Sequence, residues 1–369
     1  ENIAHLVDHP RFRFTIDSGG IMGRVPGDDD HILMAAAEDG RFKAYRVDIE
    51  DGTVKAVAAG TSRTVWFLAD LAGVVRVRVD SDEREETRTV FARATDGEPW
   101  EEIVTYSRSS ETRGFFPVGF SADSDVLYVT ALDAHGVAGL YRYDLARRQM
   151  LAAVFAHARF DLFDVLHDWR SRVVGAMRLE DAPVTAFFDP AWARAQAAVD
   201  AGIHGAVNQI ISASADGNRV IVRTSGPRAP AIYFLMDVAA NDVRELGREY
   251  PELKGVALGA VLPFTYTATD GTPIPGYVTY PSGSVRKNLP LVVLPHGGPE
   301  SRDHLDFDWK AQFLASRGYA VFQPNFRGSE GYGQAWAEAG YGQWGRLMQQ
   351  DVTDGVRRLI ADGTADPKR

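Results

Sequence analysis

Short runs of β-forming residues, separated by polar turns, recur along the first two thirds of this sequence. The clearest unit places such runs at Val118–Ser121, Val126–Ala131 and Gly139–Asp144. Two further units, at His31–Ala58 and Ile210–Asp237, repeat the pattern. An aromatic residue leads the third run of each unit, at Tyr45–Asp48, Tyr141–Asp144 and Tyr233–Asp237. A repeated pattern of this kind is typical of an array of antiparallel sheets.

The spacing between units is roughly 40 to 50 residues, which is the size of one four-stranded propeller blade. Two weaker units, at Val65–Ser107 and Phe160–Phe188, bring the number of blades in residues 1–257 to about five. We therefore predict a β-propeller, and a β-sandwich of irregular strands is the alternative. The Ala-rich segment Asp189–Asp200, with Pro190 just after an acidic cap, predicts a helix inserted between strands.

Length and charge limit the remaining possibilities. With 369 residues the chain is long enough for two domains, and a change in residue pattern near Leu258 places their predicted boundary between residues 257 and 258. The 50 acidic and 40 basic residues give a formal net charge of -10, which disfavours nucleic acid as a partner. The acidic run Asp80–Glu86 is interpreted as a solvated hairpin tip.

The sequence lacks the signals of a membrane, metal or disulfide-linked protein. No apolar run approaches the roughly 18 residues of a membrane span, so we expect no membrane partner. There is no cysteine and the nine histidines show no ligand spacing, so we expect neither a metal nor a cofactor. The first residues, Glu1–His5, contain neither an initiator Met nor a basic signal region, which predicts a start inside a longer precursor. We expect a soluble protein, with the cytoplasm favoured over the periplasm.

The last third of the sequence alternates strand and helix patterns. A hairpin pattern at Phe264–Tyr280 precedes the unbroken apolar run Leu289–Leu294, which is typical of a strand buried on both faces. Helical spacing over Phe307–Arg317 ends at Gly318, and a second buried strand is predicted at Tyr319–Pro324. A long amphipathic helix follows, so this order predicts an α/β layer with a parallel sheet. The apolar stripe of that helix consists of Met348, Val352, Val356 and Leu359, with Gly363 after it.

The loop after the first of these strands reads Pro295-His296-Gly297-Gly298-Pro299. Two consecutive glycines let the backbone turn sharply and present its N–H groups at the edge where open α/β sheets bind ligands. Such donors stabilise the negative oxygen of an acyl-transfer transition state, and lipases and esterases build an oxyanion hole from the corresponding loop. We predict that Gly297 and Gly298 form an oxyanion hole, with an ordinary Gly-Gly turn as the alternative.

Five segments of the last third carry motifs that recur in combination: Leu291–Pro299, Arg317–Val321, Pro324–Gly333, Asp351–Val356 and Asp366–Arg369. Together they resemble the serine peptidases of the prolyl oligopeptidase family, in its acylaminoacyl-peptidase and dipeptidyl-aminopeptidase branch. The resemblance implies a propeller of about seven or eight blades followed by an α/β-hydrolase domain. This sequence would then hold an incomplete propeller and, in residues 258–369, the N-terminal part of the hydrolase domain.

The resemblance also implies catalytic residues that this sequence does not contain. The family's nucleophile elbow, Gly-x-Ser-x-Gly, follows the segment that ends at Arg369, and no such motif occurs in the sequence. The nucleophilic Ser, the Asp and the His are therefore expected beyond residue 369, on the C-terminal remainder of the hydrolase domain as a second polypeptide or a missing segment. The run Arg327–Gly331 contains Ser329, but arginine stands where the elbow has its first glycine.

Two residues are candidates for substrate binding. His296 stands in the predicted oxyanion loop with no serine partner evident from the sequence, so packing within the loop or hydrogen-bond donation is the preferred interpretation. Arg327 is able to hold a substrate carboxylate, but an ion pair that fixes its glycine-rich loop is favoured.

We therefore expect the complete protein to be a serine peptidase that cleaves short peptides through an acyl-enzyme. Restricted access through the propeller is implied by the resemblance. This chain alone is expected to be inactive, because it lacks the nucleophile and its base. An esterase and an isopeptidase of the lasso-peptide type are alternatives with the same chemistry. A non-catalytic propeller that binds a protein partner is an alternative from another class.

Overall fold

The computed structural model describes residues 19–25, 27–107 and 114–369. It divides into two compact units, which are described separately here. Of the described residues, those within 1–133, 139–156 and 165–174 form the first unit, and those within 134–138, 157–164 and 175–369 form the second. These units do not coincide with the boundary expected between residues 257 and 258, and that boundary stays a prediction.

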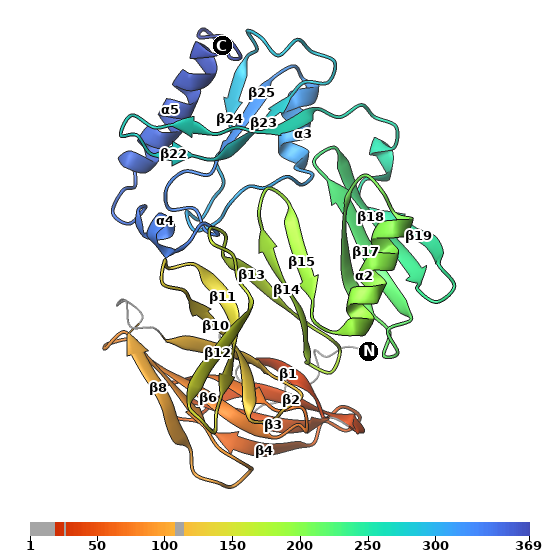
Figure 1. Cartoon of the computed structure of the whole chain (residues 1–369), viewed down its shortest axis with the longest axis vertical. Coiled ribbons are helices and arrows are strands. Elements are labelled where there is room, and N and C mark those ends of the chain that lie inside the picture. Colours follow the sequence, from red (N-terminus) through yellow and green to blue (C-terminus); the bar gives the residue numbers. More distant parts are fainter. Residues whose placement is uncertain (1–18, 26, 108–113) are drawn as a thin grey trace. The chain divides into compact units, whose positions relative to one another are not determined.

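Three four-stranded antiparallel sheets follow one another along the first unit, and in each the strands lie side by side in chain order (Figure 1). The first sheet holds β1 (Gly19–Val25), β2 (Asp28–Glu38), β3 (Arg41–Asp48) and β4 (Val54–Ala59). The second holds β5 (Thr64–Ala69), β6 (Val75–Asp82), β7 (Thr87–Ala92) and β8 (Glu101–Ser107). The third holds β9 (Phe115–Phe120), β10 (Val126–Leu132), β11 (Ala138–Asp144) and β12 (Gln149–Phe155).

The turns between these strands follow the residue types that the sequence provides. Asp39 and Gly40 join β2 to β3 with φ angles of 51° and 72°. Positive φ at both central residues is the requirement of a type I′ hairpin, which an Asp-Gly pair meets at low cost. The acidic run Asp80–Glu86 forms the hairpin between β6 and β7, and residues 83–86 at its tip are exposed. The solvated hairpin tip is therefore confirmed.

Alternating apolar side chains join the second and third sheets. Val77, Val79 and Val90 from the second sheet form one core with Phe120 and Leu127 from the third, and each of these side chains is at most 2% exposed. Burial of a side chain of this size contributes about 1.5–3 kcal/mol. Each sheet is therefore stabilised by its neighbour along the chain.

Two further antiparallel sheets follow. A three-stranded sheet holds β13 (Leu162–His167), β14 (Val173–Leu179) and β15 (Pro183–Phe187). A four-stranded sheet holds β16 (Val207–Ala213), β17 (Arg219–Gly226), β18 (Ala229–Asp237) and β19 (Asp242–Arg248), and a short 3-10 helix, η1 (Pro251–Leu253), comes after it. The pattern of repeated antiparallel sheets is thus confirmed. The number of blades and their closure into a propeller stay predictions.

The predicted inserted helix is α2 (Pro190–Gly202), between β15 and β16. The Asp189 carboxylate accepts hydrogen bonds from the backbone N–H groups of Ala191 and Trp192, so it caps the helix as the sequence indicates. The buried side chains Ala195 and Val199 pack α2 against the sheet β16–β19. These contacts make the helix part of the core of that sheet.

The C-terminal part of the second unit is built on a mixed sheet in the order β20-β23-β25-β24. Its strands are β20 (Ala260–Pro263), β23 (Gly276–Tyr280), β25 (Ala320–Pro324) and β24 (Leu291–Val293). The pair β24 and β25 is parallel and the other two pairs are antiparallel, so the sheet is mixed and not parallel throughout as predicted. The strand–helix–strand connection between β24 and β25 is the predicted α/β unit.

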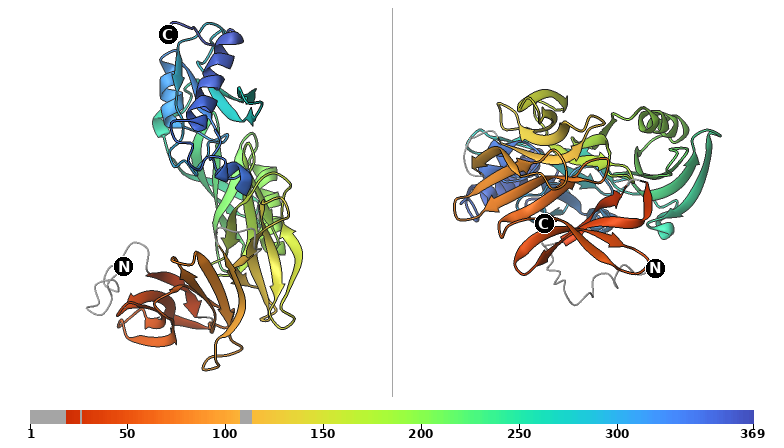
Figure 2. Two further views of the ribbon diagram at one scale, coloured as in Figure 1. Left: turned by 90° about the vertical axis from the view of Figure 1, so that its left-hand side faces the viewer. Right: turned by 90° about the horizontal axis from the view of Figure 1, so that it is seen from below.

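Helices cover both faces of this sheet (Figure 2). On one face, Leu359 of α5 (Leu347–Ala361) packs against Val278 and Phe322. On the other face, α3 (Trp309–Ser316) contacts β23 and β25. A third, short helix, α4 (Gln334–Glu338), lies between β25 and α5 in the chain. No helix in the described part of the chain is both long enough and apolar enough to cross a membrane.

Two predictions about the strands need correction. The hairpin expected over Phe264–Tyr280 is a short pair, β21 (Tyr266–Thr267) and β22 (Pro273–Ile274), because β23 pairs with β20 instead. The apolar run Leu289–Leu294 was expected to be buried on both faces, but the side chains of β24 are only half-buried. The reason is that β24 is the last strand of the sheet and has a strand neighbour, β25, on one side.

The buried stripe of α5 also differs from the expected one. Met348 and Leu359 are buried as predicted, but Val352 and Val356 are only half-buried. The buried positions between them hold Gly355 and two aspartates, Asp351 and Asp354, whose carboxylates bind groups from other segments. A pattern read from apolar residues alone misses such a stripe, because its polar members are buried with their partners. Gly318 and Gly363 end their helices at φ of 95° and 73°, as predicted.

Candidate active-site loops

The loop predicted as an oxyanion hole leaves the sheet at the carboxyl end of β24. Pairing with β25 continues to Leu294, whose N–H donates to Phe322 O at 2.8 Å. Residues 295–299 then turn away from the sheet. Because β24 and β25 are parallel, the loops after both strands meet at one edge of the sheet, which is where open α/β sheets bind ligands.

Gly297 and Gly298 are both exposed in this loop, but the backbone requires glycine at only one of the two positions. Gly298 has φ of 125°, and a Cβ at this position would lie 2.7 Å from the backbone N of Glu300. A Cβ at Gly297 would meet no atom within 4 Å. Within the described residues neither N–H donates a hydrogen bond. Both donors are therefore available to a ligand, and only position 298 depends on glycine.

His296 connects this loop to the loop after β25. Its ring stacks on Phe326, with ring centroids 4.7 Å apart and an interplanar angle of 10°. Nδ1 lies 2.9 Å from Gly297 O, and Nε2 lies 2.9 Å from Ser329 Oγ. Burial lowers the pKa of His296 below its ordinary value of 6.5. The imidazole is thus fixed between the two loops on both of its edges.

The contact between His296 and Ser329 corrects the expectation that this histidine has no serine partner. Ser329 is fully buried, and its hydroxyl also donates to Phe326 O at 2.6 Å. A buried hydroxyl directed at a backbone carbonyl is not placed to attack a substrate. The two residues are 33 positions apart in the chain. The one feature of the sequence that could have indicated their contact is that each follows one of two neighbouring parallel strands.

Arg327 is bound by two carboxylates. Its Nε and Nη2 donate to the two carboxylate oxygens of Asp351 at 2.7 and 2.6 Å, and Nη1 lies 2.9 Å from Asp270 Oδ2. Arg327 is 7% exposed and Asp351 is fully buried. The hydrogen bonds from Arg327 hold the pKa of the Asp270 carboxyl well below its usual range. The guanidinium therefore joins the loop after β25 to α5 and to the turn between β21 and β22.

Residues from the preceding β-sheets position the same loops. Arg302 donates from Nη1 to Leu179 O and from Nη2 to Glu180 O, each at 2.9 Å, and its guanidinium lies 4.1 Å from the ring centroid of Tyr332. The Asp161 carboxylate accepts from Gly333 N at 2.7 Å. All of these residues belong to the second compact unit. The sequence contains no spacing that would have predicted these contacts.

The residues that the structure describes contain no group of three or more His, Asp or Glu side chains arranged to hold a metal ion. The arrangement instead offers exposed backbone donors at a sheet edge. Such donors suit the binding of a carbonyl oxygen that becomes negatively charged.

Comparisons with known proteins relate the chain to a family of peptidases. Residues 305–369 match the model of the prolyl oligopeptidase family. The chain is 27% identical over 344 residues to dipeptidyl aminopeptidase BIII of Pseudoxanthomonas mexicana, covering 86% of this chain and 47% of that protein. It is 25% identical over 353 residues to dipeptidyl peptidase family member 6 of Caenorhabditis elegans, covering 87% and 47%. The chain thus spans about half the length of these curated relatives.

Solved structures share the fold. A puromycin-hydrolyzing peptidase of Mycobacterium tuberculosis aligns with a TM-score of 0.69 and 20% identity, covering 97% of this chain and 57% of that one. A prolyl endopeptidase aligns with a TM-score of 0.65 and 14% identity, covering 95% and 53%. The match over residues 305–369, together with these similarities, confirms the predicted resemblance to the prolyl oligopeptidase family.

Proposed function

We propose that the protein to which this chain contributes is a serine peptidase that hydrolyses short peptides through an acyl-enzyme. The family match and the peptidase names of the curated relatives support this reaction class. In this proposal a serine attacks the substrate carbonyl, and the N–H groups of Gly297 and Gly298 stabilise the oxyanion. The antiparallel sheets before residue 250 form a propeller that restricts access to short peptides.

The observation that carries the proposal is the pairing of the C-terminal residues with the free side of β24. Leu289 and Ala365 form a parallel bridge, Asp366 N donates to Leu289 O at 2.8 Å, and Leu291 N donates to Arg369 O at 3.1 Å. A strand that continued from residue 369 would therefore lie parallel to β24. Its carboxyl end would reach the same sheet edge as Gly297 and Gly298, where a nucleophile elbow is required.

We accordingly place the nucleophilic Ser, the Asp and the His of the triad in sequence that follows residue 369. His296 and Arg327 then act on the substrate indirectly. His296 orients the oxyanion loop through Phe326 and Ser329, and Arg327 fixes the neighbouring loop through its two carboxylate partners. Ser329 is not the nucleophile in this proposal, because its side chain is buried.

Labelling with a fluorophosphonate probe, which reacts with activated serines, tests this assignment. The chain of residues 1–369 is expected to remain unlabelled and inactive, and the protein extended by its following sequence is expected to be labelled once. Labelling of the 369-residue chain itself would contradict the assignment of the nucleophile. Turnover of linear peptides, isopeptide-linked peptides and esters by the extended protein then separates a peptidase from an isopeptidase or an esterase.

A pair of alanine variants of the extended protein tests the oxyanion loop. Gly298→Ala forces a Cβ against Glu300 N and shifts the donor, so we expect kcat/KM to fall by about 100-fold. Gly297→Ala is the matched control, since its Cβ meets open space, and a change below about threefold is expected from the added methyl alone. Equal activities of the two variants would exclude the loop geometry as the source of catalysis.

A further inference from the structure

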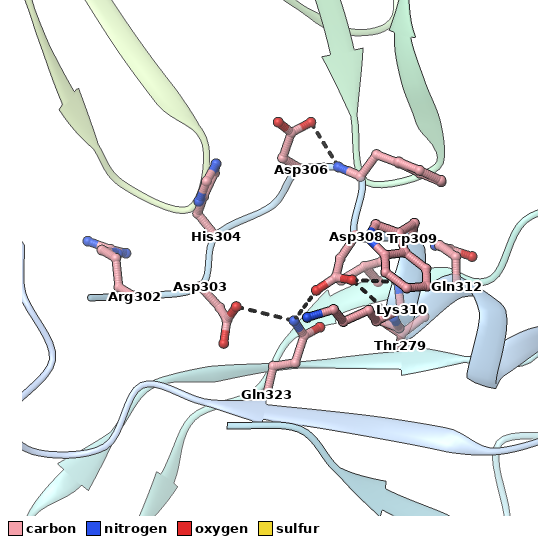
Figure 3. A pocket seen from close by; sticks show the side chains of 13 residues that line it. Thr279, Arg302, Asp303, His304, Asp306, Asp308, Trp309, Lys310, Gln312 and Gln323 are labelled. Atoms are coloured by element: carbon pink, nitrogen blue, oxygen red, sulfur yellow. Dashed lines mark hydrogen bonds between the residues drawn. The ribbon is translucent and has the colours of Figure 1, made fainter. Parts of the chain in front are cut away.

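The proposed oxyanion loop, residues 295–299, is fixed to the sheet on both sides. Before it, pairing of β24 with β25 continues to Leu294. After it, the Asp303 backbone exchanges two hydrogen bonds with the Asn325 side chain, at 2.8 and 2.9 Å, and Gln323 Nε2 donates to Asp303 Oδ1 at 3.2 Å. Figure 3 shows the Gln323 side chain directed toward this carboxylate. The orientation of the peptides between these two ends therefore depends on contacts within the loop.

One such contact fixes the peptide between Gly297 and Gly298. Gly297 O lies 2.9 Å from His296 Nδ1, and in the described part of the chain no other group binds this carbonyl. The peptide is trans, so its C=O and its N–H point in opposite directions. A ring that holds Gly297 O therefore sets the direction of the Gly298 N–H, which is one of the two donors assigned to the oxyanion above.

The same contact determines which ring nitrogen of His296 carries the proton. A carbonyl oxygen can only accept, so a hydrogen bond to Gly297 O requires a hydrogen on Nδ1. Burial lowers the pKa of His296 below its ordinary value, and the nearby positive charge of Arg302 lowers it further, so the ring is neutral near neutral pH. A neutral imidazole has one N–H, and Nε2 is then an acceptor that needs a donor.

The hydroxyl of Ser329 is placed to donate to Nε2. Ser329 Oγ lies 2.9 Å from Nε2 and 2.6 Å from Phe326 O, so its single hydrogen has two acceptors within reach. Phe326 O already accepts from Ser329 N at 3.0 Å, whereas Nε2 has no other donor among the described residues. The hydroxyl can therefore serve Nε2 without leaving the carbonyl unpaired. Ser329 is fully buried, which shields this bond from competing water.

We propose that Ser329 is a positioning residue for oxyanion stabilisation. Its hydroxyl donates to His296 Nε2 and holds the ring with the proton on Nδ1, and the ring in turn holds the Gly297–Gly298 peptide so that the Gly298 N–H is presented to the substrate. The parallel stack of the ring on Phe326 keeps both hydrogen bonds in one plane. This role rests on the proposed function, because it concerns the oxyanion of that reaction.

Nitrogen-15 NMR of the histidine rings of the 369-residue chain tests the geometry without any need for activity. The signals of His296 are assigned by their loss in His296→Asn. At about pH 7.5 we expect a protonated Nδ1 and a bare, hydrogen-bonded Nε2. Ser329→Ala is expected to move the Nε2 signal toward that of a bare nitrogen without a hydrogen bond. A proton on Nε2, or on both nitrogens, would overturn the proposal.

Steady-state kinetics of the protein extended by its following sequence, with a peptide substrate, test the positioning. Ser329→Ala is expected to lower kcat about tenfold and to change KM less than about twofold, because the oxyanion forms only in the transition state. Ser301→Ala is the matched control, since this serine follows the same loop and its backbone O keeps its hydrogen bond from Glu330 N at 3.0 Å. An unchanged kcat in Ser329→Ala, or an equal loss in Ser301→Ala, would refute the role.

Variants of His296 show whether Ser329 acts through the ring. His296→Asn places an amide N–H near the position of Nδ1, so we expect kcat within about fivefold of the unchanged protein, and a loss of about 50-fold in His296→Ala. Adding Ser329→Ala to His296→Ala is expected to cause no further loss. A further loss of about tenfold would show that Ser329 acts independently of the ring and would overturn the proposal.

Two further outcomes separate this role from the proposed function. If the unchanged extended protein turns over no peptide, the proposed function fails and this role fails with it. If the protein is active and Ser329→Ala leaves kcat unchanged, the role alone fails. Urea denaturation shows whether each variant folds. If Ser329→Ala does not fold, the tautomer in the unchanged chain and the activity retained by His296→Asn decide the proposal.

Discussion

Buried arginines occur both in the β-sheets of the first unit and in the C-terminal part of the second, but their partners differ. In the sheet β5–β8, Arg76 Nε donates to Arg93 O at 3.1 Å and Arg93 Nε donates to Val75 O at 2.8 Å. The guanidinium of Arg93 also lies 4.6 Å from the ring centroid of Trp100. These arginines connect strands of one sheet, and Arg76 also donates to Ser124 O at 2.6 Å, next to the third sheet.

The arginines of the C-terminal part connect segments that are distant in the chain. Arg302 binds the carbonyls at the end of β14, more than 120 positions earlier, and Arg327 joins Asp270 to Asp351. A sheet in a repeated array is stabilised mainly by its neighbours, as in other repeat proteins. The loops at the edge of the mixed sheet have no such neighbours, and a few non-local polar contacts hold them. We therefore expect substitutions to act locally in the first region and over long distances in the second.

The largest effect is expected at Arg327. Arg327→Leu leaves the fully buried Asp351 carboxylate without its cation, so we expect the free energy of unfolding to fall by about 3–5 kcal/mol, measured by urea denaturation. Arg327→Lys keeps the charge but loses the two parallel hydrogen bonds, and an intermediate loss is expected. A loss below about 1 kcal/mol in Arg327→Leu would show that the ion pair contributes no more than a surface pair.

Arg302→Met tests the long-range contact. The substitution leaves Leu179 O and Glu180 O without their donors, and we expect a loss of about 2–3 kcal/mol. Hydrogen exchange should increase both near Arg302 and at the end of β14, since the contact joins these segments. If hydrogen exchange increases only near residue 302, the contacts of Arg302 act as locally as those of the arginines in the first unit. The contrast between the two regions would then be wrong.

Arg93→Met is the corresponding substitution in the first unit. We expect a smaller loss of about 1–2 kcal/mol, because methionine retains contact with Trp100 while the hydrogen bond to Val75 O is lost. Faster hydrogen exchange should be confined to the sheet β5–β8 and the sheets next to it in sequence. An increase at distant sheets of the same unit would contradict local stabilisation.

The smallest effect is expected from Asp270→Asn. The pKa of Asp270 is held below its usual range, so its contribution to stability is present above about pH 4 and is lost as the pH falls through the folded-state pKa. The side chain of Asp270 is 41% exposed, and solvent screening limits the expected loss at neutral pH to about 0.5 kcal/mol. The stabilities of the variant and the unchanged chain should converge in acid. A difference that does not shrink between about pH 5 and about pH 2 would exclude the ion pair as its cause.

The local elements of this molecule could be predicted because their causes are local. The hairpin at Asp39 and Gly40 follows from residues that tolerate positive φ, and α2 begins where Asp189 caps it. The glycines at the end of α3 and α5 were predicted for the same reason. The motifs of the last third were sufficient to predict the family resemblance.

The contacts around the candidate site could not be predicted in the same way. His296 meets Ser329 only because β24 and β25 lie parallel and side by side, and no residue near either position indicates the pair. Asp351 is buried in a helix stripe that apolar spacing alone does not assign. The half-buried state of β24 depends on its position at the end of the strand order. Each of these features depends on which segments become neighbours after folding.

The contacts of the Asp161 carboxylate limit where the chain can be cut into fragments. Besides Gly333 N, it accepts from Ala138 N at 2.8 Å, so one side chain links two short segments of the β-sheet region to the loop after β25. A fragment cut at residue 258 would lose this link together with the carbonyl partners of Arg302. The smallest independently useful piece that keeps these loops in place therefore starts well before the α/β pattern begins in the sequence.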